Sequence, residues 1–446
     1  MRENIVRQLP FVLPPVVHVH ALELRRMSEV LDRMPQLGAL VTGDLTEGLR
    51  NAGAGRLGMS GEQVLRTAIL KQMMGWSYTE LSFHLLDSPT YRAFCRFGLM
   101  DRAPKRATLH ANLKKLRPET FEQANQAIVR RAQRAGVESG QRIRIDSTVV
   151  DANIHHPADS NLLWDVVRVL TRLLGSAKSL CPQISFHNHC RRARRRQLAI
   201  GNVPTMAMRV PLYRELIELT RRTLGYAENA AVALDRSDTF ATDAVAARLR
   251  HFIELGTRVV EQAHRRVLGG ESVAASEKLV SIFEPHTDVI VKGGRETLYG
   301  HKIFVNVGAS GLVLDMLMER GNPSDSARVS TLLERHRKVC GRMPREAAFD
   351  AGFTSTANVE EARKLGVRNA AFARKGAVDV LAGMRTPDAH KRLGRFRAGV
   401  EGIISFTKRC FGLDRCDWRG YRSFHAYVWL SVVSANLLLL ARHTMH

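Results

Sequence analysis

Two hydrophobic patterns divide the chain. Alternating, β-branched runs typical of strands occur at 142–150 and then again only after residue 285. Between them, residues 152–285 repeat apolar positions at helical spacing. Three helices are predicted there, at 162–174, 210–224 and 239–268. Because the first strand would pair with the later strands, we interpret 152–285 as a helical insertion within one α/β catalytic domain, which 140–151 and 286–409 form.

The strands after residue 285 indicate a mixed sheet. Residues 302–307 and 312–319, joined by Gly308-Ala-Ser-Gly311, predict an antiparallel hairpin. A helix capped by Ser324 or Asp325 is predicted to run to about residue 336. The remaining predicted elements are strands at 289–291, 347–350 and 367–373, and a helix at 356–365. Antiparallel strands followed by alternating helix and strand are typical of a mixed sheet covered by helices.

A basic, all-α segment precedes the first strand. We interpret residues 1–57 as a leader with one helix at 20–34, and 58–135 as a helical domain in which Ser60 and Gln63 cap the first helix. Further helices are predicted at 79–86 and 107–116. Six basic and no acidic residues lie from Arg102 to Arg117, which favours a helix-turn-helix-like module with Lys114 and Lys115 on DNA phosphates. The alternative is an ordinary helical bundle with a solvated basic edge.

The charge of the chain narrows the class of partner. The 446 residues are enough for two or three domains, and 67 Lys and Arg against 43 Asp and Glu give a net charge of +24. Such an excess favours a polyanion, because Lys and Arg release counterions from a phosphate backbone. A ribosomal or merely adhesive basic protein is the alternative. A hydrophobic content of 45% argues against a disordered basic tail.

Cysteine usage and apolar stretches indicate the compartment. Six scattered cysteines form no regular framework, so we interpret them as reduced thiols of a cytoplasmic protein. Residues 11–19 are too short and too broken by proline for a secretory signal. The C-terminal segment 410–446 holds the most apolar stretch, 426–441, which is short for a bilayer span and contains polar residues. A buried helix, and no membrane contact, is predicted.

Three acidic residues carry the candidate chemistry. Asp146 lies in the first strand, and Asp350 ends a short strand that breaks at Gly352. Glu401 lies in a helical segment flanked by basic residues. Two Asp and one Glu on a basic chain suggest a carboxylate cage for divalent metal that acts on a phosphodiester.

Basic residues accompany the third carboxylate. At about 100° per residue, Arg397, Glu401 and Lys408 fall within roughly 40° of one another on a helix. This stripe would present a carboxylate to a metal and two cations to DNA phosphates. The opposite side is expected to pack on the sheet through Val400, Ile403 and Phe406. The alternative is a surface ion pair between Arg397 and Glu401.

Other polar clusters in the sequence have competing interpretations. The arginines at 191–196, including Arg194 and Arg195, are interpreted as a disordered or loop-borne phosphate contact, with a solvated run as the alternative. The spacing Cys181-x5-His187-x-His189-Cys190 disfavours zinc. Asp151, Asp159 and Asp165 are interpreted as helix caps or solvated loop residues, and additional metal ligands are the disfavoured alternative. Lys292-Gly-Gly-Arg295 lacks the ending of a nucleotide-binding loop.

These segments resemble the DDE transposases of bacterial insertion sequences over most of the chain, and the unclassified, ISNCY-type group in particular. The residues that carry the resemblance are Arg144-Ile-Asp-Ser-Thr148, Tyr299-Gly-His-Lys302, Arg320-Gly-Asn-Pro-Ser-Asp-Ser326, Phe349-Asp-Ala-Gly-Phe353 and Arg397-x3-Glu401-x6-Lys408. The last matches the Arg, Glu and Lys of the family's Tyr-Arg-Glu-Lys signature, whereas Gly394 stands at the Tyr position. The resemblance implies a ribonuclease H-like catalytic domain, with Asp146 and Asp350 on adjacent central strands and Glu401 on a helix beside them.

The expected function is transposition of an insertion sequence. The protein would bind the terminal inverted repeats in double-stranded DNA, then cleave the strands and join them to target DNA. Two Mg²⁺ ions, or Mn²⁺, would be held by Asp146 as the bridging ligand, with Asp350 and Glu401 each on one metal. A homodimer or larger assembly, cytoplasmic and associated with the bacterial nucleoid, is expected. The rivals are a nuclease of the same fold without strand transfer, an inactive DNA-binding regulator, and a basic RNA-binding protein.

Overall fold

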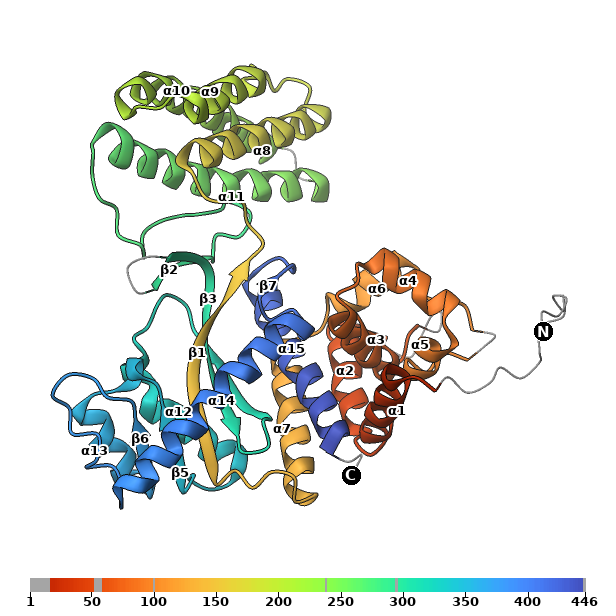
Figure 1. Ribbon diagram of the computed structural model, residues 1–446. Coiled ribbons are helices and arrows are strands. Elements are labelled where there is room, and N and C mark those ends of the chain that lie inside the picture. The colour runs from red at the N-terminus through yellow and green to blue at the C-terminus, as the bar shows by residue number, and fades with distance from the viewer. Residues whose placement is uncertain (1–16, 52–57, 99–100, 237–238, 293–295, 444–446) are drawn as a thin grey trace, which may run out of the picture.

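A seven-stranded mixed sheet organises the computed structural model, which describes residues 17–51, 58–98, 101–236, 239–292 and 296–443 (Figure 1). The strands are β1 (Arg142–Ala152), β2 (Asp288–Lys292), β3 (Glu296–Gly308), β4 (Val313–Met318), β5 (Glu346–Phe349), β6 (Asn369–Phe372) and β7 (Arg415–Cys416). Their order is β2-β3-β1-β5-β6, with β4 also on β3 and β7 also on β1. The strands β2, β3, β4 and β1 pair antiparallel, whereas β5 and β6 run parallel to β1. The predicted mixed sheet is confirmed, including pairing of the first strand with the later set.

A glycine allows β1 and β3 to approach closely. Gly300 faces Asp151 of β1 and Asp288 of β2 in the register. A Cβ atom at Gly300 would lie 1.9 Å from the Val150 carbonyl oxygen and 2.8 Å from the Asp151 Cα. No side chain fits such a gap, so glycine at this position keeps the two central strands in register.

Helices cover the sheet and extend from it. On the sheet lie the 3₁₀ turns η2 (Asp325–Arg328) and η3 (Ala351–Phe353) and the helices α12 (Val329–Cys340), α13 (Thr356–Lys364) and α14 (Pro387–Phe411). The predicted cap before α12 is wrong. Ser324 makes no side-chain capping bond, and Asp325 forms an ion pair with Lys302 of β3 instead. The helix proper therefore begins at Val329.

The N-terminal helices share their core with the sheet. They are α1 (Val19–Asp32), α2 (Gln36–Thr46), α3 (Gly61–Met74), α4 (Tyr78–Asp87), α5 (Pro89–Phe94), α6 (Arg106–Leu113) and α7 (Pro118–Arg134). The capping box predicted at Ser60 is present, because the Ser60 hydroxyl accepts from the Gln63 N–H and the Gln63 side chain accepts from the Ser60 N–H. One hydrophobic cluster runs from these helices through the sheet to the C-terminal helix.

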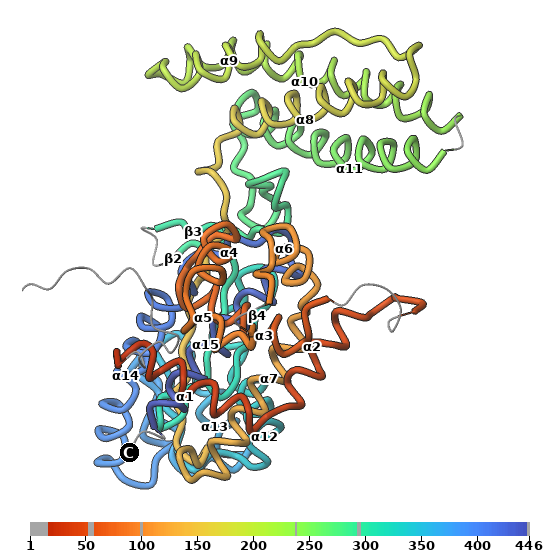
Figure 2. The backbone as a smooth tube through the Cα atoms, turned by 90° about the vertical axis from the view of Figure 1, so that its right-hand side faces the viewer, coloured from red at the N-terminus to blue at the C-terminus, as the bar shows by residue number. Residues whose placement is uncertain are grey.

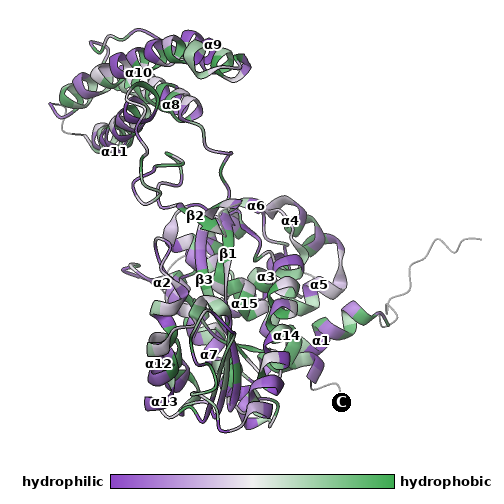
Figure 3. Cartoon of the chain, turned by 60° about the vertical axis from the view of Figure 1, so that its left-hand side comes forward, coloured by the Kyte–Doolittle hydropathy of each residue, from purple (hydrophilic) through white to green (hydrophobic). Residues whose placement is uncertain are grey.

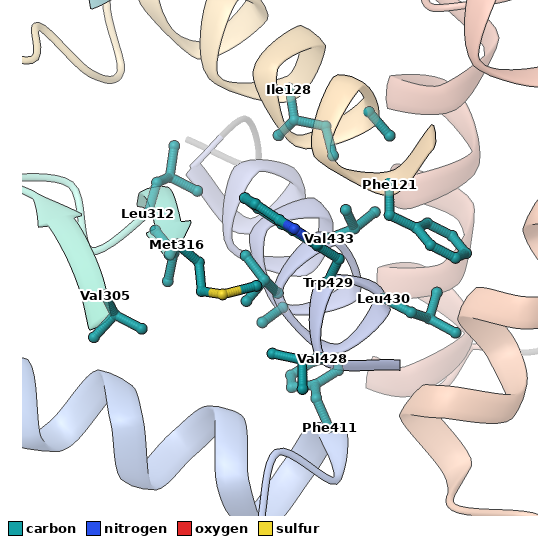
Figure 4. Packing of buried hydrophobic residues seen from close by; sticks show 14 of the residues in the cluster. Phe121, Ile128, Val305, Leu312, Met316, Phe411, Val428, Trp429, Leu430 and Val433 are labelled. Atoms are coloured by element: carbon teal, nitrogen blue, oxygen red, sulfur yellow. The ribbon is translucent and has the colours of Figure 1, made fainter. Parts of the chain in front are cut away.

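The C-terminal helix α15 (Tyr421–His443) connects the two parts. It packs on α7, α3, α1 and β4, and Trp429 is fully buried beside Phe121 and Val433 (Figure 4). Asn436 donates to the side chain of Asn125 and exchanges hydrogen bonds with the Val313 backbone. By length and composition α15 is the one helix in the described residues that could cross a membrane, yet 89% of its most apolar window is buried within the protein. It therefore serves as a core helix here.

Four long helices form a separate bundle. They are α8 (Asp159–Leu180), α9 (Cys190–Asn202), α10 (Met206–Leu234) and α11 (Phe240–Ala263), the last extended by a π-helical turn, His264–Leu268. This α8–α11 bundle has its own hydrophobic core. Figures 1 and 2 show that it stands away from the sheet. Two chain connections, 153–158 and 269–287, join it to β1 and β2, as Figure 3 also shows.

The arginine run lies in a helix, so the interpretation of 191–196 as a loop is wrong. Residues 190–202 form α9, because Ala193 and Ile200, seven positions apart, are buried on the core of the α8–α11 bundle. Arg192 and Arg196 both pair with Glu215 of α10. Burial of this narrow apolar side and the ion pairs with Glu215 therefore stabilise the segment as a helix.

Candidate active site

The two aspartates are brought together by a parallel pairing. In the register of β1 and β5, Ile145 lies opposite Phe349. Asp146 and Asp350 each come one residue later. Because equivalent positions of parallel neighbours point to the same face of a sheet, both carboxylates face the side that α14 covers.

Small residues let α14 approach that face. Leu393 of α14 packs on Ala348 of β5 and Ala371 of β6. Further along, Gly399 leaves room for Arg144, whose guanidinium lies 4.7 Å from the Phe396 ring and donates to the Phe396 carbonyl oxygen at 3.0 Å. A Cβ at Gly399 would lie 2.1 Å from that guanidinium. These contacts fix the helix that carries the third carboxylate.

The three predicted carboxylates line one cavity of about 750 Å³. Asp146 comes from β1, Asp350 from the end of β5, and Glu401 from α14. Lys408, two turns after Glu401, lines the same cavity. Residues separated by about 250 positions in the sequence therefore form one acidic pocket with a basic rim.

The carboxyl group of Asp146 has a raised pKa. Burial, together with the nearby charges of Asp350 and Asp325, raises its pKa from 3.8 to about 6. The Ser147 N–H, which donates to Asp146 Oδ1 at 2.7 Å, and the charge of Arg397 oppose this shift. A cation bound beside this half-buried carboxylate would stabilise its ionised form, which burial and the neighbouring like charges disfavour.

Arg397 and Lys408, the two side chains predicted to contact DNA phosphates, both bind other groups of the protein in this structure. Arg397 Nη1 lies 3.0 Å from Asp350 Oδ1, so its partner is Asp350 and not the Glu401 of the surface-pair alternative. Lys408 Nζ donates to the Val149 carbonyl oxygen at 3.0 Å and lies 3.5 Å from Asp414 Oδ1. Both basic side chains are thus anchored at the edge of the cavity.

The donor set of the cavity suits a hard divalent cation. Among the residues that the structure describes, no three His, Cys, Asp or Glu side chains converge closely enough to hold a metal ion as they stand. Asp146, Asp350 and Glu401 nevertheless offer only carboxylate oxygens to one cavity, and such ligands are preferred by Mg²⁺ and Mn²⁺. The ligand type of this cavity therefore fits the cation that the sequence implies.

Five other polar residues of this cavity were not predicted as site residues, and two of them, Ser147 and Thr148, directly follow Asp146. Ser405 and Arg409 of α14 line the cavity, as does Asp414 from the turn before β7. Asp414 is positioned because its carbonyl accepts from the Asp151 N–H at 2.9 Å, beside the pairing of β7 with β1. A two-residue strand has no pattern that sequence reasoning can detect, whereas the positions of Ser405 and Arg409 follow from the helical stripe of Glu401 and Lys408.

The other predicted residues lie elsewhere. Lys115 donates to the Leu45 carbonyl oxygen at 3.1 Å, and Lys114 is exposed at the end of α6. Arg194 lies over the Trp164 ring at 5.7 Å and bonds to Gln197, whereas Arg195 is exposed on α9. Asp159 accepts from Gln262 and Arg266, and Asp165 pairs with Arg168, in agreement with structural roles. The glycines of Lys292-Gly-Gly-Arg295 lie outside the described residues.

The fold and the pocket define a mixed α/β protein with a carboxylate-lined cavity suited to phosphodiester chemistry. Two family models match the chain, the Transposase DDE domain over residues 283–437 and the Transposase domain (DUF772) over residues 17–115. The chain therefore belongs to the insertion-sequence DDE transposases, DNA-cleaving enzymes whose partner is DNA. Asp350 and Glu401 lie within the DDE match, whereas Asp146 and the α8–α11 bundle lie between the two matches.

No curated protein and no solved structure matches the chain.

Proposed function

We propose that this protein binds the terminal inverted repeats of its insertion sequence and performs metal-dependent strand cleavage and strand transfer, with Asp146, Asp350 and Glu401 as the catalytic carboxylates. The observation that carries the proposal is their convergence, with Lys408, on one cavity from three separate elements. The DDE match supports it independently. The ISNCY-type group remains our proposal for the subfamily, on the strength of the Arg397-x3-Glu401-x6-Lys408 spacing.

Sheet topology supports a ribonuclease H-like catalytic domain. Along the path β4-β3-β1-β5-β6, three antiparallel strands are followed by two parallel ones. We propose that 140–151 and 286–409 form this domain, that 152–285 is its insertion, and that 1–57, 58–135 and 410–446 are the leader, the DNA-binding domain and the C-terminal segment. The separate core of the α8–α11 bundle favours this division.

Each residue of the pocket has a proposed role. Asp146, Asp350 and Glu401 would hold two Mg²⁺ ions through their carboxylate oxygens. When bound, the ions activate the attacking oxygen and stabilise the leaving 3′-oxygen. Glu401, the most exposed of the three, orients the attacking water or 3′-hydroxyl. Lys408 holds a phosphate beside the scissile bond, as does Arg397 once it leaves Asp350, and both offset its developing negative charge.

DNA contacts outside the pocket complete the proposal. Lys114 and Lys115 follow α6, and we propose that this basic end of a helix-turn-helix-like unit contacts repeat DNA. Arg194 and Arg195 on α9 would contact phosphates from the bundle. Coordinated cutting of two ends favours a homodimer or larger assembly on DNA, in a cytoplasmic protein that associates with the nucleoid.

Linear DNA that carries the element's own ends, incubated with Mg²⁺, tests the proposal. Wild-type protein should nick the ends and join them to target DNA, and both products should be lost in Asp146→Ala and Glu401→Gln. A matched control is Glu360→Gln, an exposed carboxylate of α13 away from the cavity. Nicks without joined products would identify a nuclease, and equal products in all variants would refute the assignment of the three carboxylates.

A further inference from the structure

A second cavity, of about 520 Å³, lies where the α8–α11 bundle meets the two connections that join it to the sheet. Both connections line it, the first through Asn153–Pro157 and the second through Val280–Glu284. Side chains of α8, of α11 and of the turn before α15 complete its wall. This junction cavity is separate from the carboxylate pocket, with which it shares no lining residue.

The charge of the junction cavity is positive. Four arginines and two carboxylates line it, together with three exposed histidines. Both carboxylates already have partners, because Asp165 pairs with Arg168, and Glu284 accepts from His286 and from the Gly420 N–H. The excess positive charge therefore belongs to the remaining arginines.

Three arginines converge there without a partner. Arg172 comes from α8, Arg248 from α11 and Arg419 from the turn between β7 and α15. All three are exposed, and within the part of the chain that the structure describes no side chain of the three forms a hydrogen bond, ion pair or ring contact. The arginines at 192, 194 and 196, although conspicuous in the sequence, are already bound within the bundle. Free guanidinium groups from three separate elements are well suited to bind phosphate.

Strand β1 runs from the carboxylate pocket toward the junction cavity. Lys408 contacts Val149 within this strand, and Arg415 donates to the Ile154 carbonyl oxygen just after it. From Asp146 to Asn153, where the cavity begins, seven residues of extended chain span roughly 23 Å at about 3.3 Å per residue. One strand of B-DNA has a phosphate every 3.4 Å or so along the axis, so this span is roughly seven nucleotides.

We propose that the junction cavity is a second DNA-backbone site, in which Arg172, Arg248 and Arg419 bind phosphates roughly seven nucleotides from the scissile one. The inference rests on the proposed function for the position of the scissile phosphate. Because the three arginines come from the bundle and from the sheet side, a bound strand would also fix the bundle relative to the carboxylate pocket.

The experiment measures binding of duplex DNA carrying the element's ends, over a range of salt concentrations. Arg172→Gln, Arg248→Gln, Arg419→Gln and the triple variant are compared in the Asp146→Ala background, so binding is read without chemistry. Each lost phosphate contact should reduce the slope of log affinity against log salt by roughly 0.9. The triple variant should bind about tenfold more weakly or worse, and arginine-to-lysine replacements should retain most of the binding. Arg258→Gln, an exposed arginine of α11 outside the cavity, is the matched control.

Modified DNA then locates the contact. Neutral methylphosphonates roughly six to eight nucleotides from the cut should weaken wild-type binding and leave the triple variant unaffected. An unchanged salt slope in the triple variant, or an equal loss in Arg258→Gln, overturns the proposal. End cleavage by the same three substitutions made with Asp146 intact would leave the proposed function intact. A free mononucleotide that raises the Tm of wild-type protein but not of the triple variant, with unchanged DNA binding, would assign the cavity to a small phosphate ligand instead. Failure of wild-type protein to bind end DNA would refute both proposals.

Discussion

Arg397 of α14 forms an ion pair with Asp350 at the end of β5, with Nη1 and Oδ1 3.0 Å apart. A carboxylate that is proposed to bind metal is thus neutralised by the arginine of the Arg397-x3-Glu401-x6-Lys408 signature. The exposed fractions of the two side chains are 24% and 43%. Breaking this ion pair in exchange for ions from solvent therefore costs little free energy, since such partly exposed pairs contribute about 1 kcal/mol or less. We expect Arg397 to stay paired with Asp350 until a metal ion competes for the aspartate or a phosphate competes for the arginine.

The first prediction concerns this exchange. Arg397→Gln should bind Mn²⁺ up to about fivefold more tightly than wild-type protein without DNA, because the competing guanidinium is removed. The same variant should cleave DNA more slowly, since it lacks a cation at the scissile phosphate. Calorimetric titration with Mn²⁺ measures the affinity, with Arg395→Gln, an exposed neighbour on α14, as control. Weaker Mn²⁺ binding in Arg397→Gln than in the control would contradict the competition.

The second prediction concerns pH and Asp146. Its pKa is about 6 in the folded protein against 3.8 for the free group, so the folded state binds the proton more tightly. This carboxyl therefore favours folding below about pH 4, and the contribution is lost as the pH rises through 6. Asp146→Asn has no charge to desolvate and can still accept from the Ser147 N–H. In EDTA at pH 8 it should be more stable by up to about 3 kcal/mol, with little difference at pH 4.

Thermal unfolding at the two pH values measures this effect. Glu360→Gln, on an exposed face of α13, should change the Tm little at either pH. Adding Mg²⁺ at pH 8 should stabilise wild-type protein and leave Asp146→Asn nearly unchanged. If Asp146→Asn is less stable than wild-type protein at pH 8 in EDTA, the ionised carboxylate of Asp146 does not lower the free energy of unfolding, and the prediction is wrong.

The third prediction concerns Gly300 between β1 and β3. Gly300→Ala places a Cβ 1.9 Å from the Val150 carbonyl oxygen, and backbone atoms cannot turn aside as a side chain can. Overpacking of this kind costs about 1–3 kcal/mol. The Tm should therefore fall, and cleavage should fall with it because β1 carries Asp146. Gly394→Ala on α14, where the new Cβ meets nothing within 4 Å, should be neutral or stabilising by up to about 1 kcal/mol. Equal effects of the two substitutions would refute the steric argument.

Sequence patterns predicted the strands that carry the two aspartates, and the resemblance placed these aspartates on adjacent strands, but neither predicted the partners of the basic residues. Asp146 lies in a strongly alternating strand and Asp350 at a strand end before a glycine, so their adjacency follows from a parallel pairing. The Arg397–Asp350 pair was not predicted, because helical spacing compares Arg397 only with residues of its own helix. The α9 helix was missed for a related reason. Its apolar side is only Ala193 and Ile200, and its counter-charge comes from Glu215 on another helix.

The last prediction concerns the Lys302–Asp325 pair below the carboxylate pocket. Lys302 Nζ lies 2.5 Å from Asp325 Oδ1 and donates to the Pro323 carbonyl oxygen at 2.9 Å. The other carboxylate oxygen lies 2.3 Å from where a Cβ of Gly352 would be, so Asp325 presses against the turn that follows Asp350. Lys302 and Asp325 lie in two of the motifs shared with transposases, and we infer that the pair positions this turn.

Asp325→Asn and Lys302→Met should therefore lower kcat for end cleavage by about tenfold to a hundredfold, because small displacements of a catalytic group are costly. The affinity for end DNA should change little, since neither side chain lines the carboxylate pocket or the junction cavity. Single-turnover cleavage and anisotropy binding separate the two quantities, and Glu360→Gln again serves as control. If the pair is only structural, the Tm of both variants will fall and kcat per folded molecule will stay at the wild-type value. A rise in KM with unchanged kcat would instead make Lys302 a DNA contact and refute the positioning role.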